Sequence, residues 1–333
     1  MELGCILSSQ AKGRYMRPIV LIMLGALQGG LLATPADAAE PLKVFSLPAI
    51  LESSALLVAV EKMPASEAVS MSGGIPNLWE GERVSFPGLA DVAGNAETQA
   101  LRFSLKHPDL RLILTVAEGL YRIVGRRSAG ISSLADLKGK RIATRTDTSA
   151  AYYLKSALAA GHLTEADVEI VASTPKEMAD ALIVRKIDAI AIWEPEAERA
   201  ALALGADAVS LQPDQLYREF YSLNTTAAAL ADPAKRAQIV GFVRTLIGVC
   251  GEVTANPDRA QALYATRSGG DPAVIRAAWK HHRFSCSLPA ELAGIMAEQE
   301  QWMAGLDKRA PRRPEELAKL IDPSVLKEAL EKR

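Results

Sequence analysis

The order of hydrophobic and polar segments along the chain predicts strands that alternate with helices up to about residue 224. Short apolar runs, each bounded by glycine, proline or polar residues, have the length of buried strands. We expect these strands over residues 42–47, 68–71, 91–93, 110–116, 140–144, 168–172 and 189–193. Strands that alternate with helices of the intervening lengths are typical of βαβ units and a parallel sheet.

The clearest helix boundaries lie in the second half of this α/β pattern. The helix-start residues 146–149 precede an alanine-rich helix over residues 150–160, and Gly161 ends it. Another helix begins at Pro175, because proline is favoured in the first helical turn. After about residue 224 the pattern is almost entirely helical. We therefore expect an α/β chain with a helical C-terminal tail.

The N-terminal segment has the order of a secretory signal peptide. Basic residues precede an apolar run over residues 19–27, and small residues follow up to Ala38. The run is shorter than the roughly 20 apolar residues that span a bilayer; a membrane anchor or a buried helix is the alternative. We expect residues 1–38 to be removed and the product to be periplasmic, whether Met1 or Met16 begins the chain.

Composition and charge narrow the classes of function. The chain is 49% hydrophobic and 23% charged, as in ordinary globular proteins. Its formal net charge is −1 and its basic residues form no stripe, so we expect no nucleic-acid partner. His281 and His282 are adjacent rather than one helical turn apart, which argues against a shared metal face. We expect no metal site and no cofactor.

Cys250 and Cys286 are the two cysteines that remain after the predicted cleavage. They could pair in an oxidising compartment. Alternatively, they are two small, unpaired residues of the core, and we slightly favour this interpretation.

Three segments carry a resemblance to a known family. They are, in chain order, residues 90–95 (ADVAGN), residues 131–144 (ISSLADLKGKRIAT) and residues 186–195 (KIDAIAIWEP). In this order, behind a signal peptide, they resemble the nitrate/sulfonate/taurine-type solute-binding proteins of ABC importers. These proteins share their fold with the thiamine-pyrimidine synthases. The resemblance covers roughly residues 41–250.

This resemblance implies a type II periplasmic-binding-protein fold. Two doubly wound lobes would be joined by a hinge, with lobe 1 formed by residues 39–122 and 224–333 and lobe 2 by residues 123–223. A small organic solute would be captured between the lobes when they close. The implied partners are the permease subunits and cytoplasmic ATPase of an ABC importer, and the binding protein itself would be a monomer.

The family fold also implies which polar loops line the cleft. The expected residues of lobe 1 are Ser46, Leu47, Gly73, Gly74, Asn95, Glu97 and Thr98. The expected residues of lobe 2 are Thr146, Thr148, Ser149, Trp193 and Glu194, with Asn224 at the return crossing. Tyr121 and Tyr152 are weaker candidates. Such positions lie at the carboxyl ends of strands, where open α/β sheets bind ligands.

Most of these residues also have an ordinary structural interpretation. Gly73 and Gly74 allow close approach to a ligand or simply form a turn. Thr148 and Ser149 begin a helix, whose free N–H groups bind polar groups, but they also serve as caps. Trp193 is a stacking wall or a core residue. The sequence leaves these alternatives open.

Acidic residues in the candidate loops separate this chain from the anion-binding members of the family. These residues are Glu97, Glu118, Asp147 and Glu194. Carboxylates repel a sulfonate or nitrate, although Arg122 and Arg145 lie nearby in the sequence. A neutral, zwitterionic or cationic organic ligand therefore fits at least as well as an anion.

Two other classes of function share parts of this pattern. A thiamine-pyrimidine-synthase-like enzyme would need a reacting histidine and a cysteine-rich motif, and the candidate loops contain neither. A hydrolase of the Gly-x-Ser-x-Gly type is not indicated, because no such motif occurs. A sensor subunit that binds a solute for a signalling partner remains an alternative. We interpret the chain as a binding protein rather than an enzyme.

Overall fold

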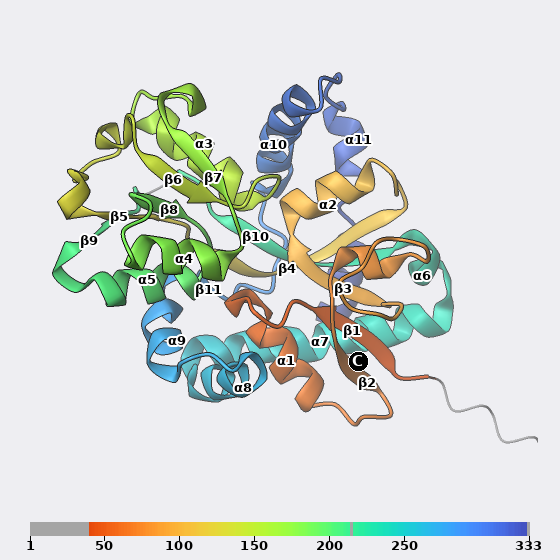
Figure 1. Cartoon of the computed structure of the whole chain (residues 1–333). Helices are drawn as coiled ribbons and strands as arrows, with labels where there is room; N and C mark the ends of the chain where they lie inside the picture. The colour runs from red at the N-terminus through yellow and green to blue at the C-terminus, as the bar shows by residue number, and fades with distance from the viewer. Residues whose placement is uncertain (1–39, 214–215, 332–333) are drawn as a thin grey trace, which may run out of the picture. The chain divides into compact units, whose positions relative to one another are not determined.

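The computed structural model describes residues 40–213 and 216–331. The predicted signal peptide, residues 1–38, lies outside the described residues. From Glu40 onward the chain forms one compact unit that contains two β-sheets (Figure 1). Both sheets are mixed rather than wholly parallel, because strands that the apolar pattern did not predict pair in the antiparallel direction.

The larger sheet has six strands in the order β11-β4-β10-β3-β1-β2. Its strands are β1 (Leu42–Ser46), β2 (Ala68–Ser72), β3 (Val92–Ala96), β4 (Leu110–Gly119), β10 (Glu219–Thr226) and β11 (His282–Arg283). Strands β1, β2 and β3 are parallel, whereas β10 runs antiparallel to both β3 and β4. The carboxyl ends of β1 and β3 therefore lie at the same edge.

The smaller sheet has five strands in the order β7-β6-β8-β5-β9. Its strands are β5 (Ile123–Arg126), β6 (Arg141–Thr144), β7 (Glu169–Ala172), β8 (Ala189–Ala191) and β9 (Ala208–Leu211). Strand β6 is parallel to β7 and β8, as the alternating pattern predicts.

Two connections join the sheets. The first runs from the end of β4 to the start of β5, close to the crossing expected near Arg122. The return runs from Leu211 at the end of β9 to Glu219 at the start of β10. Asn224 therefore lies inside a strand of the six-stranded sheet, not at the return crossing. Ser222, Asn224 and Thr225 interrupt the apolar residues of this buried strand, which hides it from a search for apolar runs.

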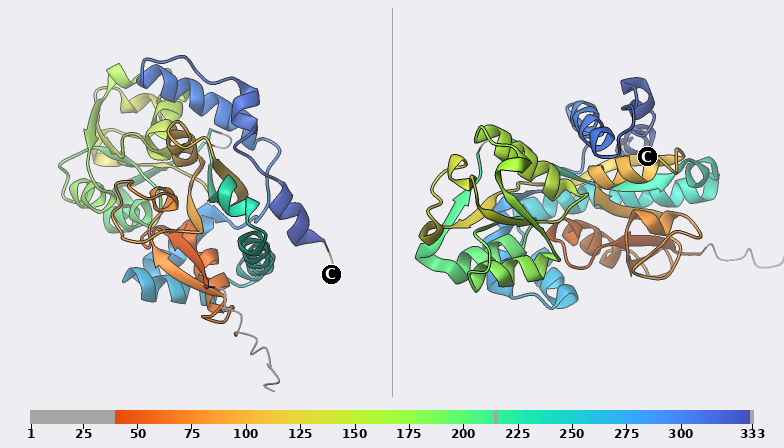
Figure 2. Two further views of the ribbon diagram at one scale, coloured as in Figure 1. Left: turned by 90° about the vertical axis from the view of Figure 1, so that its right-hand side faces the viewer. Right: turned by 45° about the horizontal axis from the view of Figure 1, so that its top comes forward.

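Helices cover the faces of both sheets. They are α1 (Ser54–Glu61), α2 (Glu97–Ser104), α3 (Ser149–Ala160), α4 (Pro175–Ile183), α5 (Glu196–Leu204), α6 (Ala227–Ala231), α7 (Pro233–Ala255), α8 (Asp258–Ser268), α9 (Pro272–Ala278), α10 (Leu292–Leu306), α11 (Pro314–Ala318) and α12 (Ser324–Leu330). The 3₁₀ turns η1 (Leu51–Ser53) and η7 (Trp279–His281) precede α1 and β11. Helix α10 packs against α2 and α11 (Figure 2).

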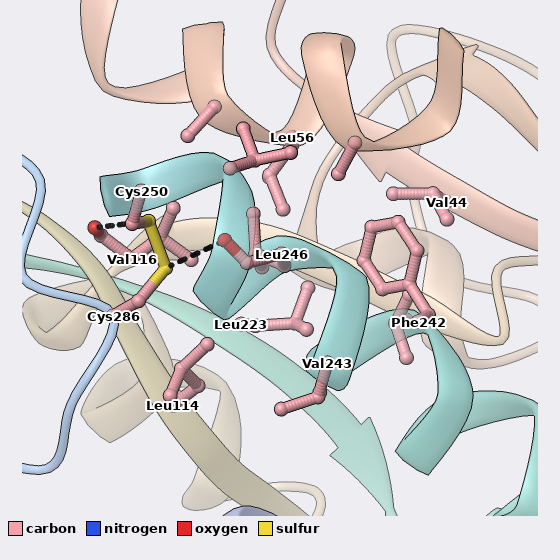
Figure 3. Close-up of a cluster of buried hydrophobic side chains, with 14 of the residues drawn as sticks. Val44, Leu56, Leu114, Val116, Leu223, Phe242, Val243, Leu246, Cys250 and Cys286 are labelled. Atoms are coloured by element: carbon pink, nitrogen blue, oxygen red, sulfur yellow. Dashed lines mark hydrogen bonds between the residues drawn. A yellow bond between two sulfur atoms is a disulfide. The ribbon is translucent and has the colours of Figure 1, made fainter. Parts of the chain in front are cut away.

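Helix α7 is the long helix that the sequence predicts after Asp232. By length and composition it could cross a membrane. Its apolar side, which includes Phe242, Val243 and Leu246, packs instead into the main hydrophobic cluster with Leu56 of α1 and Leu223 of β10 (Figure 3). Asp232 caps its start by accepting hydrogen bonds from the next N–H groups.

Cys250 of α7 and Cys286, which follows β11, form a disulfide at the edge of this cluster (Figure 3). Both residues are also buried. The preference for two unpaired core cysteines was therefore wrong, although their burial was expected. The disulfide links the segment after β11 to α7, the helix that packs against the larger sheet.

Candidate functional site

A small cavity lies where the first connection leaves the six-stranded sheet. Its volume is about 10 Å³, roughly the space that one water molecule needs. Both sheets and the C-terminal segment contribute to its lining, which consists of Glu52, Gly119, Leu120, Tyr121, Ile192, Trp193, Glu194, His281 and His282. Trp193 follows β8 and packs against the hydrophobic clusters of both sheets. The cavity is therefore enclosed by the two lobes together.

Two carboxyl groups flank Gly119 at this cavity. A Cβ added to Gly119 would lie 2.9 Å from Oε1 of Glu52 and 3.7 Å from Oε2 of Glu219. Both carboxyl groups therefore lie against Gly119, and a side chain at this position would collide with Glu52. Both glutamates are almost fully buried. Burial, followed by repulsion from Glu52 and Glu97, raises the pKa of Glu219 well above its usual value.

Tyr121 connects this pair of carboxyl groups to the second lobe. Its hydroxyl donates a hydrogen bond of 2.5 Å to Oε2 of Glu219 and lies 2.9 Å from Oγ of Ser149. Ser149 is the first residue of α3 in the smaller sheet's layer. The contact therefore joins a residue of the hinge connection to both lobes.

Glu97 is a third buried carboxylate in this region, but its oxygens are already bound by protein donors. They accept hydrogen bonds from Phe220 N at 2.9 Å, from Nε2 of Gln299 at 2.6 Å and from the hydroxyl of Tyr217. Burial nevertheless raises its pKa. The side chain ties α2 to the return connection and to α10.

Arg122 organises the cluster on the other side of the cavity. Its Nη2 lies 2.8 Å from Oε1 of Glu194 and also contacts Glu198. Glu194, Glu198 and His281 each have an atom that could bind a metal ion, and these three atoms lie within 4.8 Å of one another. Burial and the neighbouring Arg122 lower the pKa of His281 to about 3, so its imidazole is neutral. A metal ion here would have to displace the guanidinium, and the arrangement suits a buried ion-pair cluster better than a metal centre.

His282 lies beside Glu52, with Nε2 3.2 Å from Oε1 of that carboxylate. Burial is the largest single influence and opposes protonation, but the charge and hydrogen bond of Glu52, the charge of Glu194 and a backbone hydrogen bond at Ala278 together raise the pKa of His282. The candidate loops contain no histidine, and both histidines of the cavity come from a different segment, residues 281–282. Strand β11 pairs with the end of β4 and brings a distant C-terminal segment to the cavity.

Comparison with known proteins identifies the family. A sequence model described as NMT1/THI5 like matches residues 87–260, which is more than half of the chain. The chain belongs to the NMT1/THI5-like family. No curated protein matches it.

Several solved structures resemble this NMT1/THI5-like protein. The periplasmic aliphatic sulphonate-binding protein SsuA from Escherichia coli has 20% identity and a TM-score of 0.68, with 85% of this chain and 92% of that chain covered. The periplasmic nitrate-binding protein NrtA from Synechocystis has 12% identity and a TM-score of 0.68, with 87% and 88% covered. The desulfurization enzyme DSZB has 17% identity and a TM-score of 0.61, with 88% and 99% covered. At these identities the likeness establishes the fold, as the resemblance implies.

Four of the residues predicted for the ligand lie at or near the cavity of this NMT1/THI5-like protein. Trp193 and Glu194 line it, Ser149 reaches it through Tyr121, and Glu97 belongs to the same group of buried carboxylates. Thr148 caps α3 by accepting a hydrogen bond from Ala150 N at 3.3 Å, so its structural role is present. Thr146 is exposed.

Other predicted residues make contacts within the larger sheet. A Cβ at Gly73 would meet Asn77 at 2.4 Å, and one at Gly74 would meet Nδ2 of Asn95 at 3.0 Å. The close approach at these glycines is thus to protein atoms. Asn224 donates to the carbonyl groups of Ala93 and Ser222.

The remaining predicted residues lie in the same sheet's layer. Ser46 and Thr98 are buried, and Leu47 packs against the main hydrophobic cluster. The structure thus does not bring all predicted residues together.

Sequence analysis missed Glu52, Gly119, Glu219 and His282. Glu52 follows the end of the predicted first strand, residues 42–47, by five residues and could have been included with that loop. No comparable signal marks the other three, because their proximity depends on how β4, β10 and β11 pair.

Proposed function

We propose that this protein is the periplasmic substrate-binding component of an ABC importer. It captures a small organic solute between its lobes by hinge closure and delivers the solute to permease subunits that work with a cytoplasmic ATPase. It acts as a monomer, without a cofactor, and as a binding protein rather than an enzyme. The single observation that carries this proposal is the space between the lobes, which comprises the small cavity beside the first connection and a larger cavity of about 710 Å³ along both connections, each lined by residues of both lobes.

Some of the contacts across the lobes are exposed and of a kind that can open, although Ala151 and Tyr152 of α3 also pack into a buried cluster with residues of the other lobe. Nε2 of Gln99 donates to the carbonyl oxygen of Asp147 at 3.0 Å, and Arg102 lies 3.4 Å from the carboxylate of Asp147. Both are solvent-exposed contacts between the lobes, and exposed ion pairs contribute little free energy. Only two connections would have to bend, so opening requires few backbone changes. A solute that binds the closed form better would shift the equilibrium toward it.

Family membership and related structures support the transport role. SsuA and NrtA, which have the same fold, are described as periplasmic binding proteins for aliphatic sulphonates and nitrate. The predicted signal peptide agrees with that location. The ligand class of these proteins does not carry over, because the cavity of this chain contains several carboxylates.

Purification of the protein from its native periplasm, followed by native mass spectrometry, tests the proposal. We expect a bound small molecule, and small-angle scattering should show compaction when that molecule is restored to the stripped protein. Trp193→Ala should weaken its binding about 10-fold, since a wall of the cavity is removed. Trp79→Ala is the matched control, because Trp79 stacks on His107 outside the cavity. A stripped protein that neither rebinds the molecule nor changes its dimensions would contradict the proposal.

An enzymatic role is the second candidate, because His282 lies 3.2 Å from the carboxylate of Glu52 at the cavity, close enough to exchange a proton, and DSZB is an enzyme with this fold. The same experiment separates the two functions. A binding protein returns the molecule unchanged after prolonged incubation, whereas an enzyme alters its mass.

A further inference from the structure

The larger cavity between the lobes is the one that can hold an organic molecule. Its volume is about 710 Å³, whereas the small cavity, at about 10 Å³, has room for one water molecule. Cavities that bind small molecules commonly measure about 300–1,000 Å³. Leu120 and Tyr121 line both cavities, so a solute in the larger one lies next to the small cavity and to its wall at Trp193.

Three parts of the chain form the walls of this larger cavity. Tyr152 belongs to α3 of lobe 2, Tyr217 and Arg218 belong to the return connection, and Arg283 and Glu298 belong to the C-terminal segment after α9. A solute bound here contacts both lobes at once. Such a solute binds the closed form better than the open form, as capture by hinge closure requires.

Tyrosine side chains form one wall. The ring of Tyr217 stacks on that of Tyr121, with centroids 5.9 Å apart, and meets the ring of Tyr152 edge-on at 5.1 Å. The hydroxyls of Tyr121 and Tyr217 already donate hydrogen bonds to Glu219 and Glu97. These side chains therefore offer mainly ring atoms to a solute, and aromatic rings pack well against other rings.

Charged side chains line the same cavity, and they differ in how well they are paired. Arg218 and Glu291 form an ion pair with each other. Arg283 has no hydrogen-bond or ion-pair partner for its guanidinium within residues 40–213 and 216–331. Glu298 accepts a long hydrogen bond of 3.4 Å from the hydroxyl of Tyr152. The cavity thus presents one cation and one carboxylate that a solute can bind.

The chemistry of these two groups determines what the solute must carry. A guanidinium binds a carboxylate through two parallel hydrogen bonds, and an ammonium group donates up to three hydrogen bonds to acceptors such as a carboxylate. Arg283 and Glu298 lie on different elements, β11 and α10, so a solute with both charges can bind each without competition.

We propose that the solute is a zwitterion of the aromatic amino-acid class. Its ring lies against the tyrosine wall, its carboxylate binds Arg283 and its ammonium group binds Glu298. This inference rests on the proposed function and names the substrate class of the same space between the lobes. It departs from the aliphatic sulphonates and nitrate named for the related structures, because one wall is aromatic and both signs of charge line the cavity.

Three probes that share one ring test the inference. L-Phenylalanine carries both charges, 3-phenylpropionate lacks the ammonium group, and 2-phenylethylamine lacks the carboxylate. Each is titrated into the stripped full mature protein by calorimetry at neutral pH. We expect L-phenylalanine to bind, and each of the other two to bind about 10-fold more weakly, because one charged side chain of the cavity stays without a partner.

Two variants assign the charges. Arg283→Gln should weaken L-phenylalanine and 3-phenylpropionate about 10-fold and leave 2-phenylethylamine unchanged, since a bound charge pair is lost only for the first two. Glu298→Gln should weaken L-phenylalanine and 2-phenylethylamine instead. Both positions are exposed, so these variants should fold. Arg267→Gln and Glu315→Gln are the matched controls, because both residues are exposed and lie outside the cavity; they should bind L-phenylalanine like the wild type.

Other results overturn the inference. Absence of L-phenylalanine binding up to its solubility limit would exclude this class of solute, and binding that is unchanged in both variants would place the site elsewhere. Equally tight binding of 3-phenylpropionate would indicate an anionic solute, and equally tight binding of 2-phenylethylamine a cationic one. All of these results leave the transport function intact, because that function is judged separately by the co-purified molecule and the change in dimensions.

Discussion

Two groups of buried carboxylates in this protein differ in how their charge is balanced. Glu300 of α10 is fully buried, yet its oxygens lie within 3.2 Å of Nη2 of Arg309 and 2.8 Å of Nη2 of Arg312. Although burial opposes ionisation, these arginines lower the pKa of Glu300 to about 2. In the junction group of Glu52, Glu97 and Glu219, burial and mutual repulsion instead raise the pKa of Glu219.

This difference separates a structural role from a functional one. One of the arginines beside Glu300 also binds α2, since Arg312 contacts Ser104 and the carbonyl of Leu101. The charges of Glu300 and these arginines balance one another within the fold, so no further charged group is required. The junction group is destabilising when fully ionised, and groups with perturbed pKa values are concentrated at functional sites. The comparison therefore supports a ligand role at the junction.

The largest effect is expected at Glu300. Glu300→Gln should lower the free energy of unfolding by about 3 kcal/mol at neutral pH, because two arginines lose their buried partner. Urea denaturation measures this change. The lowered pKa means that the stabilisation exists above the usual value of 4.5 and is lost as the pH falls toward about 2. A Glu300→Gln variant as stable as the wild type would show that the two arginines do not stabilise ionised Glu300, and the contrast with the junction group would no longer hold.

The opposite sign is expected at Glu219. Its raised pKa means that the folded state holds this proton more strongly, so stability is highest at low pH and decreases as the pH rises through the folded-state pKa. Glu219→Gln should therefore increase the free energy of unfolding by roughly 1–2 kcal/mol at pH 8, and the gain should shrink toward pH 5. Parallel urea titrations at both pH values provide the test. A Glu219→Gln variant that loses stability at pH 8 would show that neighbouring groups balance the charge of Glu219, as the arginines balance that of Glu300.

The smallest effect is expected at Thr148, which lies at the edge of the junction but carries no charge. Thr148→Ala removes the cap of α3 and should cost about 1 kcal/mol with no pH dependence between pH 5 and 8. The same denaturation series provides the baseline for the two charged sites. A pH-dependent loss would mean that the cap is coupled to the junction carboxylates.

Much of the larger architecture could be predicted from local patterns. The parallel strands β1, β2, β6, β7 and β8 coincide with predicted apolar runs, and α3 begins and ends where its capping residues indicate. The antiparallel strands β5, β9 and β10 were not predicted. Strand β10 contains Ser222, Asn224 and Thr225 at buried positions, so its burial comes from its place between β3 and β4 rather than from apolar side chains.

The candidate site could be predicted only in part. Trp193 and Ser149 were found because strand ends and helix starts of one lobe meet at a common edge. Glu219 and His282 could not be found in this way, since antiparallel pairing and the segment fastened by the Cys250–Cys286 disulfide bring them to the cavity.

By itself the sequence determined the family, the order of the α/β elements and the acidic character of the cleft loops, because these depend on short-range pattern and residue type. Only the tertiary structure decided which acids meet. Glu52, Gly119 and Glu219 come from three separate segments, and nothing in their local sequence records that they share one space. Whether a carboxylate is neutralised, as Glu300 is by Arg309 and Arg312, or left unmatched at the junction depends on distances of a few ångströms. Electrostatic energy in a buried site varies steeply over such distances, and the chain folding as a whole fixes them.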